Sequence, residues 1–279
     1  MKIAIIQYST YGHITTLAKA VQEGVEKAGY KADLFQIPET LPQNVLDQIH
    51  APPKPKEIPI ATLETLTSYD AFLFGVPTRF GTGPAQLFDY WAATGGLWAQ
   101  GALDGKPAGV FVSTGTQGGG QETTVRNTLN FLVHHGLIYV PLGYAKAFQY
   151  QANLDEIHGG SPYGAGTLAA GDGSRQPSEL ELKIATIQGE SFAQTAARFV
   201  DGAEAAAAKE NKKKEQVPTE SNKAAAPNTT TTTTTAPTEK AADGAASSAP
   251  APAQQRAAQQ TTKAPESTDK SFCSKCTIM

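Results

Sequence analysis

The chain has 279 residues and a formal net charge of −3, a length that allows one large domain or two small ones. Its 11 Phe, 9 Tyr and 2 Trp all precede residue 200, with the exception of Phe272. Between residues 201 and 277 the only Val, Ile or Leu is Val217. Because a folded domain must bury apolar side chains to offset chain entropy, we expect one globular domain over residues 1–202 and a disordered low-complexity linker over 203–271. A two-domain enzyme is excluded.

Charge and cysteine usage exclude further classes of protein. Residues 1–200 carry 13 Lys and Arg against 17 Asp and Glu, which is not the basic footprint of a nucleic-acid-binding protein. We expect no signal peptide, because the first apolar run is too short. The sequence has no run of 18 apolar residues, which is the length needed to cross a bilayer. Cys273 and Cys276 are the only cysteines, so no disulfide is expected in the folded part, which fits a reducing compartment. We also expect no metal site.

Apolar, β-branched runs alternate with segments of helical periodicity along residues 1–200. In chain order, the patterns predict a strand over 2–8, a helix over 13–28, strands over 32–37 and 71–76, a helix over 84–93, a strand over 108–113, a helix over 123–135, a strand over 137–142 and a helix over 178–200. A Pro-rich insertion over 38–67 and a Gly-rich insertion over 143–177 stay unassigned. Ser178 and Glu181 form a capping-box pattern where the last helix begins.

The predicted strands are continuously apolar, so we expect both of their faces to be buried, as in the parallel sheet of an α/β fold. Five strands within residues 2–142 suit a doubly wound, flavodoxin-like five-stranded sheet of order 2-1-3-4-5, followed by the disordered tail. The six-stranded dinucleotide-binding fold is disfavoured, because the first turn lacks the pattern G-x-G-x-x-G.

Three polar loops follow the first, third and fourth predicted strands, over residues 9–14, 77–83 and 113–121. In an open parallel sheet such loops meet beyond the carboxyl ends of the strands, where ligands bind. The first loop opens a helix, so its N–H groups and the hydroxyls of Ser9 and Thr10 can hold an anion without any Lys or Arg. The third loop has four Gly in nine residues, which lets the backbone approach a flat ligand closely.

Each of these features also has an ordinary structural interpretation. The first loop could be only an N-cap, and the third only a flexible turn. Arg79 either meets a ligand or makes a surface ion pair. Trp98 stands in a stretch without helical periodicity, and it either makes a core or subunit contact or stacks on a substrate. His134 is either structural or relays a proton. The convergence of the three loops favours the ligand-binding interpretation.

The last eight residues, 272–279, form a lipidation motif. Cys276-Thr277-Ile278-Met279 has the C-a-a-X form of a prenylation site, with Met favouring a farnesyl group. Cys273 is placed for a second lipid, palmitate. Because one prenyl chain binds membranes weakly, a second chain would strengthen the attachment. We therefore expect a peripheral, lipid-anchored protein at the cytoplasmic face of a membrane, with the plasma membrane favoured.

Residues 1 to about 200 resemble the Trp-repressor-binding-protein A (WrbA) family of flavodoxin-like NAD(P)H:quinone oxidoreductases, and most of all its fungal, membrane-anchored members. The stretches that carry the resemblance are YGHI (11–14), GVPTRFG (75–81), GGLWA (95–99), STGTQGGGQE (113–122), HHG (134–136) and PYGAGTLAAGDGSRQPS (162–178). Gln117 is an extra residue relative to the shorter bacterial form. The resemblance implies FMN as cofactor, NADH or NADPH as co-substrate, and a homotetramer whose active sites are built partly by neighbouring subunits.

The resemblance also implies roles for individual residues. Tyr11 and Trp98 would contact the nicotinamide or quinone, and His134 would lie beside the flavin ring with a supporting catalytic role. The residues implied in cofactor binding are Ser9, Thr10, Tyr11, Gly12, His13 and Ile14 around the phosphate, Thr78, Arg79 and Phe80 on the flavin, Ser113, Thr114, Gly115, Thr116, Gln117, Gly118 and Gly119 around the ring, and His134.

The resulting hypothesis is an FMN-dependent enzyme that reduces quinones by two electrons to hydroquinones, in antioxidant defence at a membrane. Two alternatives stay open. A one-electron carrier of the flavodoxin type would need a strongly charged docking face, which the small net charge of residues 1–200 disfavours. A membrane-attached scaffold could bind FMN without turning over a substrate.

Overall fold

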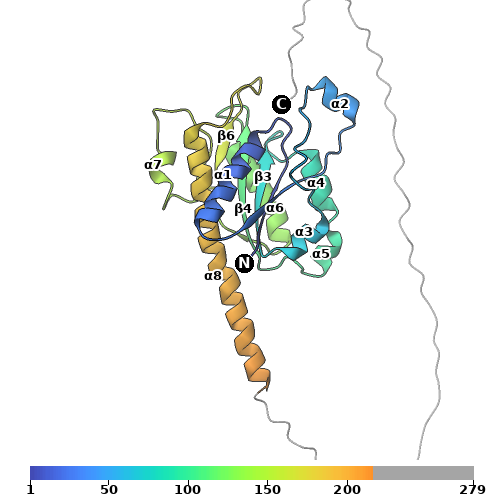
Figure 1. Cartoon of the computed structure of the whole chain (residues 1–279), viewed down its shortest axis with the longest axis vertical. Coiled ribbons are helices and arrows are strands. Elements are labelled where there is room, and N and C mark those ends of the chain that lie inside the picture. Colours follow the sequence, from blue (N-terminus) through green and yellow to red (C-terminus); the bar gives the residue numbers. More distant parts are fainter. Residues whose placement is uncertain (216–279) are drawn as a thin grey trace, which may run out of the picture. The chain divides into compact units, whose positions relative to one another are not determined.

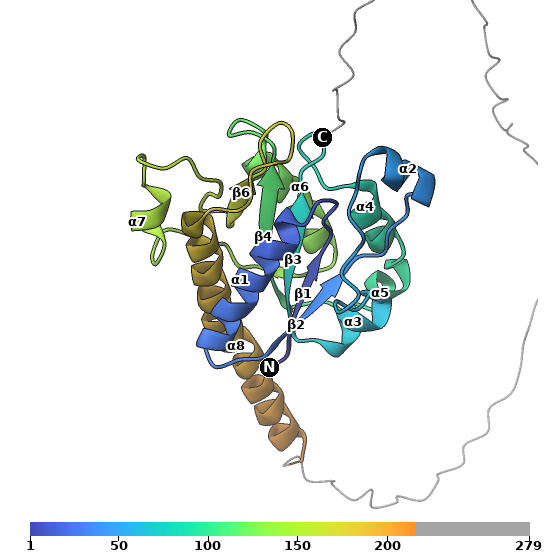
Figure 2. The same cartoon turned by 45° about the horizontal axis from the view of Figure 1, so that its top comes forward.

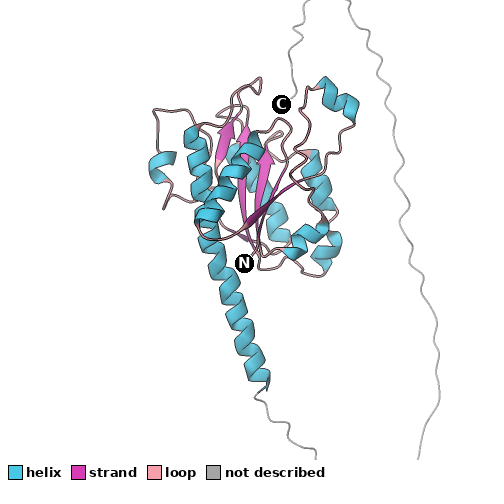
Figure 3. Cartoon of the chain, viewed as in Figure 1, coloured by secondary structure: helices cyan, strands magenta, loops and turns pink. Residues whose placement is uncertain are grey.

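The computed structural model describes residues 1–215, and Figure 1 shows their arrangement as a sheet between two groups of helices. Figure 3 distinguishes the strands from the helices and loops. The strands are β1 (Ile3–Gln7), β2 (Ala32–Gln36), β3 (Ala71–Pro77), β4 (Pro107–Thr114), β5 (Ile138–Tyr139) and β6 (Gly166–Leu168). The helices are α1 (His13–Lys27), α2 (Gln43–Gln48), α3 (Leu63–Ser68), α4 (Ala85–Ala92), α5 (Gly95–Ala99), α6 (Gln121–His134), α7 (Phe148–Gln151) and α8 (Glu179–Glu215).

The sheet is parallel and has the predicted order β2-β1-β3-β4-β5. A further short strand, β6, which the sequence pattern does not predict, pairs with β4 and leaves this order unchanged. β5 pairs with β4 at Pro107 and Ala108, and β6 pairs with the same strand farther along, at 112–114. Since β3 occupies the other edge of β4, β5 and β6 share one edge position. The insertion between them therefore interrupts a single fifth strand, which explains why the predicted strand over 137–142 is short.

Side chains alternate between the two faces of the sheet, as they must in a strand. Ile3, Ile5 and Phe111 face the core under α1 and α8. Ile6, Phe74 and Val110 face the core under α3, α4 and α6. Figure 2 shows the two helix layers on opposite sides of the strands. The continuous apolar runs therefore reflect burial on both faces, as expected for a doubly wound sheet.

Helices α1 and α8 pack together through glycines. A Cβ atom on Gly24 would lie 1.9 Å from the carbonyl oxygen of Thr186, and one on Gly189 would lie 2.0 Å from that of Val21. The two backbones are thus too close to admit any side chain at these positions. Ser178 Oγ accepts from Glu181 N (3.3 Å) while Glu181 Oε2 accepts from Ser178 N (2.8 Å), which confirms the capping box at the start of α8.

The structure assigns one open segment and corrects two local expectations. The unassigned insertion over 38–67 contains α2 and most of α3. Trp98 belongs to the short helix α5 rather than to a loop, because five residues are too few to show a helical period. Helix α8 continues to Glu215, although residues 203–215 were assigned to the linker. That segment is rich in Ala, Glu and Lys, which favour a helix even without a core to bury.

The remaining linker, residues 216–271, and the lipidation motif over 272–279 lie outside the described residues. Within residues 1–215, no helix is both long and apolar enough to cross a membrane.

The glycine contact between α1 and α8 can be tested with two substitutions in the same helix. Gly189→Ala should lower the free energy of unfolding by about 1–3 kcal/mol or more, because the new methyl group forces the two helix backbones apart. Gly202→Ala meets no neighbouring atom and should be neutral or stabilise the helix by up to about 1 kcal/mol. Urea unfolding followed by circular dichroism measures both. Equal effects of the two substitutions would contradict the close contact.

Candidate functional site

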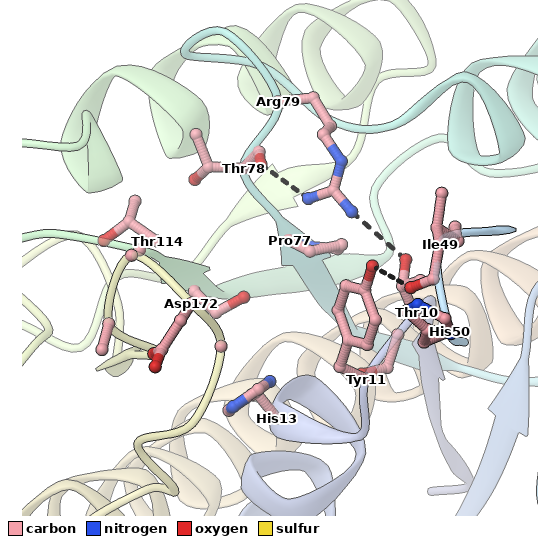
Figure 4. Close-up of a pocket in the computed structure, with 16 residues that line it drawn as sticks. Thr10, Tyr11, His13, Ile49, His50, Pro77, Thr78, Arg79, Thr114 and Asp172 are labelled. Carbon is pink, nitrogen blue, oxygen red and sulfur yellow. Dashed lines mark hydrogen bonds between the residues drawn. The ribbon is translucent and has the colours of Figure 1, made fainter. Parts of the chain in front are cut away.

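A cleft of about 320 Å³ opens at the carboxyl ends of β1, β3 and β4, within the range typical of small-molecule sites. All three predicted loops contribute to it, as do two further segments (Figure 4). The residues that line it are Ser9, Thr10, Tyr11, His13, Ile49, His50, Pro77, Thr78, Arg79, Ser113, Thr114, Gly115, Ala170, Gly171, Asp172 and Gly173. The structure thus brings the three loops together where the order of a doubly wound sheet reverses, as expected.

The first loop presents the amino terminus of α1 to the cleft. Gly12, at the N-cap, has φ 92°, which only glycine adopts without strain. Its N–H donates to Ser9 Oγ (3.0 Å), and its carbonyl accepts the first helical bond from Thr16 N (2.9 Å). The N–H groups of residues 13–15 precede that bond and have no partner within the helix. Together with the helix dipole they form an anion-binding turn, which suits a phosphate.

His13 contributes an unsatisfied polar atom to this site. Its side chain is 6% exposed, and Nε2 is buried without a hydrogen-bond partner among the described residues. A buried polar group without a partner costs about 1–3 kcal/mol, so a ligand that supplies an acceptor gains affinity here. The side chain of Ile14 lies fully in the core. Only its backbone can serve the anion site.

Arg79 connects the first two loops across the cleft. Its Nη2 donates to Thr10 Oγ1 (3.2 Å) and its Nη1 to the Thr78 carbonyl (2.9 Å), as the dashed lines in Figure 4 show. Among the residues that line the cleft, Arg79 is the one Lys or Arg. It makes no ion pair closer than 4.0 Å with another described residue, so its charge is available to a ligand. Phe80 follows with φ 51° and is 95% exposed; it does not line the cleft.

The third loop divides into two parts. Ser113, Thr114 and Gly115 line the cleft, and the Ser113 carbonyl accepts from Thr78 N (2.8 Å), which ties the second and third loops together. Gln117 and Gly118 instead line a separate cavity of about 390 Å³ beside the start of α6. Thr116 and Gly119 line neither cavity. Residues 116–119 therefore do not line the cleft itself, and their implied contact with a flavin ring stays a prediction.

Two wall segments escaped the sequence analysis. Ile49 and His50 follow α2 in the Pro-rich insertion, and the Tyr11 hydroxyl donates to the Ile49 carbonyl (2.9 Å). No local pattern signals such a long-range bond. Residues 170–173 form the opposite wall, with Ala170 at φ 65°. Here a signal existed, because AAGDG lies within the stretch that carried the family resemblance.

A buried carboxylate holds that second wall in place. Glu181 is fully buried, and it accepts from Thr167 Oγ1 (2.8 Å) and Leu168 N (3.2 Å). Arg175 pairs with Glu181 at 2.9 Å and also donates to the Leu168 and Ile157 carbonyls. The short segment between Leu168 and Arg175, which includes the wall, is thus clamped at both ends to the start of α8.

His134 and Trp98 do not reach the cleft within one chain. His134 is exposed at the far end of α6, and that helix runs 14 residues, or about 21 Å, away from its start near the third loop. Trp98 is 60% exposed in α5. The neighbouring His135 is buried and hydrogen-bonds Thr94 (2.8 Å), so α5 and the end of α6 lie together. His134 therefore does not line the cleft of its own chain, and its place beside the ring stays a prediction.

The fold and the anion-binding cleft define a flavodoxin-like protein. A structural comparison agrees: the flavodoxin-like WrbA-like protein from Agrobacterium tumefaciens matches with a TM-score of 0.50 at 20% identity, over 71% of this chain and 98% of that one. Residues 1–151 match the model of the NADPH-dependent FMN reductase family, and the chain belongs to this family.

Curated relatives are much closer in sequence. A Candida albicans protein named NAD(P)H quinone oxidoreductase YCP4 is 70% identical over 288 aligned residues, which cover all of both chains. Another, NAD(P)H quinone oxidoreductase PST3 of the same organism, is 64% identical over 71% of this chain and 98% of its own length. These matches make the chain an oxidoreductase that uses FMN and NAD(P)H.

The cleft fits FMN on its own evidence. The N–H groups at the start of α1, the unpartnered Nε2 of His13 and the available cation of Arg79 suit a phosphorylated ligand. The glycines at 115, 171 and 173 leave room for a flat ring to approach the backbone.

The assignment of the phosphate to this loop predicts a specific loss of affinity. His13→Phe keeps a flat ring but removes Nε2, and it should weaken FMN binding by about 10-fold or more, because hydrogen bonds to charged groups contribute about 1.5–3 kcal/mol. His13→Gln keeps a donor and should lose less. Quenching of flavin fluorescence during titration of the cofactor-free protein measures both. Wild-type affinity in the Phe variant would contradict the assignment.

Proposed function

We propose that the protein is an FMN-dependent NAD(P)H:quinone oxidoreductase that reduces quinones to hydroquinones by transfer of two electrons. The observation that carries the proposal is a single open cleft that combines an anion-binding turn with flat, glycine-lined walls, in a chain whose close relatives bear this name. Bound FMN supplies the chemistry, since a flavin accepts a hydride from a nicotinamide and passes it on.

The residues of the chain contribute binding and orientation. The turn over residues 9–14 holds the phosphate, and Arg79 holds Thr10 and the backbone of Thr78 in fixed positions at its side. Tyr11 Oη is held by the Ile49 carbonyl at the mouth of the cleft, where it can contact whichever planar substrate enters. The cleft is open to solvent, so water can supply the proton that completes reduction of a quinone oxygen.

The proposal includes a homotetramer in which a second chain completes each site. Trp98 in α5, Val133 near the end of α6 and Phe88 in α4 are large apolar side chains that are exposed, and apolar surface of this kind can mark an interaction surface. Association through this surface would allow Trp98 and His134 of one chain to serve the cleft of another, in the roles that the family resemblance implies.

The proposal places the enzyme at the cytoplasmic face of a membrane, through lipids on Cys276 and Cys273. Support comes from the C-a-a-X form of the last four residues alone. Attachment there would bring the cleft near membrane quinones and suits a role in defence against oxidative stress.

The proposed reaction has a defined stoichiometry. The full chain loaded with FMN should oxidise NADPH only when a quinone is supplied, and it should consume one NADPH for each quinone without uptake of oxygen. Absorbance at the NADPH band and an oxygen electrode measure the two quantities. The cofactor-free protein is the control. Oxygen uptake in step with NADPH loss would point to one-electron transfer, and an FMN-bound protein without turnover would point to a scaffold.

The lipid anchor can be tested separately from the chemistry. Cys276→Ser should move the protein from the membrane fraction to the soluble fraction of cells, while quinone-dependent turnover of the purified protein stays unchanged. Thr277→Ser is the matched control, because it retains the cysteine and the C-a-a-X form. An unchanged membrane fraction for Cys276→Ser would refute the anchor.

A further inference from the structure

A lysine from the Pro-rich insertion reaches the anion-binding turn from behind. Lys54 lies between α2 and α3, and its Nζ donates to the Ser9 carbonyl at 2.7 Å. The same atom stands 4.0 Å from the centre of the Tyr8 ring, a distance suited to a cation–π contact. Its side chain is 25% exposed. This lysine does not line the cleft, yet it is bonded to the first residue of the turn that does.

The same lysine is paired with a carboxylate that is almost buried. Glu39 Oε2 lies 3.1 Å from Lys54 Nζ, and the Glu39 side chain is 15% exposed. The carboxylate also accepts from the Tyr8 hydroxyl (2.8 Å) and Gln86 Nε2 (2.7 Å). Burial raises the pKa of Glu39, but the hydrogen bonds from Tyr8, the Leu41 N–H, Lys54 and Gln86 outweigh it and bring the pKa below its usual value. Glu39 is therefore a stable negative charge behind the phosphate site.

The negative charge of Glu39 lies close enough to the turn to repel an anionic ligand that binds there. One ammonium group bridges the Glu39 carboxylate and the Ser9 carbonyl, so the carboxylate lies within two hydrogen-bond lengths of the turn. The turn itself has no Lys or Arg. Like charges this close repel strongly where water is largely excluded. Without Lys54, the carboxylate and the free lone pairs of the Ser9 carbonyl would oppose a phosphate, and Arg79, which bonds Thr10 from the second loop, would have to offset both.

We propose that Lys54 is a positioning residue for the cofactor phosphate. Its ammonium group cancels the charge of Glu39 behind the turn and occupies the Ser9 carbonyl, so that the N–H donors of the turn dominate the electrostatic field at the phosphate. The proposal rests on the assignment of FMN to the cleft. It gives the Pro-rich insertion two attachments to the turn, Lys54 to Ser9 and Ile49 to Tyr11, and makes this insertion part of the cofactor site.

The test compares FMN with riboflavin, which has the same ring and no phosphate. Binding of each to the cofactor-free full chain is measured by flavin fluorescence. Lys54→Met should weaken FMN binding by about 10-fold or more while riboflavin binding changes by less than about 2-fold. Lys56→Met is the matched control, since Lys56 is exposed in the same segment and should change neither affinity. Lys54→Arg keeps the charge and should retain most of the preference for FMN.

Removal of the carboxylate should reverse the loss. In Glu39→Gln/Lys54→Met the repelling charge is gone, so the ratio of FMN to riboflavin affinity should recover most of what Lys54→Met lost. Glu39→Gln alone should raise this ratio, because it leaves the charge of Lys54 uncompensated beside the turn, and it keeps the proposal testable if Lys54→Met does not fold.

Three outcomes would overturn the proposal. Equal losses of affinity for FMN and riboflavin in Lys54→Met would show a role in folding only, unchanged affinities for both flavins would show no role, and a ratio that does not rise in Glu39→Gln would contradict the repulsion. Failure of the wild-type chain to bind either flavin would instead refute the proposed function itself.

Discussion

Parallel pairing of β1 with β3, and of β3 with β4, is the constraint from which the cleft follows. It directs the carboxyl ends of all three strands to one edge, so three loops that are far apart in the sequence become neighbours. It also sets α1 to begin at that edge, with its unpaired N–H groups beside Arg79 from the second loop and Ser113 from the third. The bonds from Arg79 to Thr10 and from Thr78 to Ser113 then lock the loops to one another. The anion site is thus a property of the sheet and of the loops at its edge, while two further wall segments arrive from elsewhere.

Those two wall segments come from insertions. The segment between β2 and β3 supplies Ile49 and His50 to one wall, and the segment after β6 supplies residues 170–173 to the other. Each is held by a buried or half-buried carboxylate, Glu39 in the first case and Glu181 in the second. In both cases the carboxylate pairs with a cation and accepts several further hydrogen bonds, which is the condition under which a charge can be kept away from water. The sheet forms the floor of the site, and one ion pair stabilises each of the two segments that form its walls.

Local patterns were sufficient for the parts of the structure that depend on local physics. The apolar runs around Ile5, Phe74 and Val110 predicted the main strands, and the periodicity from His13 onward predicted α1 within one residue. The converging loops also followed, because sheet order determines where they lie.

The remainder of the structure depends on contacts across long stretches of chain. Lys54 bonds a residue 45 positions away, and nothing near Lys54 signals that partner. His134 shows the opposite limit, since the family resemblance implies a role beside the ring but does not predict that the residue lies at the far end of α6. Residues 203–215 were misassigned because a lack of core residues was equated with a lack of helix.

The shared edge of β4 has a consequence for the integrity of the molecule. β5 and β6 pair with the same edge of β4, one after the other, and the residues between them leave the sheet and return to it. The chain before this excursion is held in the sheet through the pairing of β5 with β4. The chain after it is held through the pairing of β6 with β4, through Glu181 and through the packing of α8 on α1. A protease nick in the excursion would cut the covalent connection without removing either fragment from the core. The clipped molecule should remain assembled as a non-covalent pair of fragments with its ligand-binding end intact.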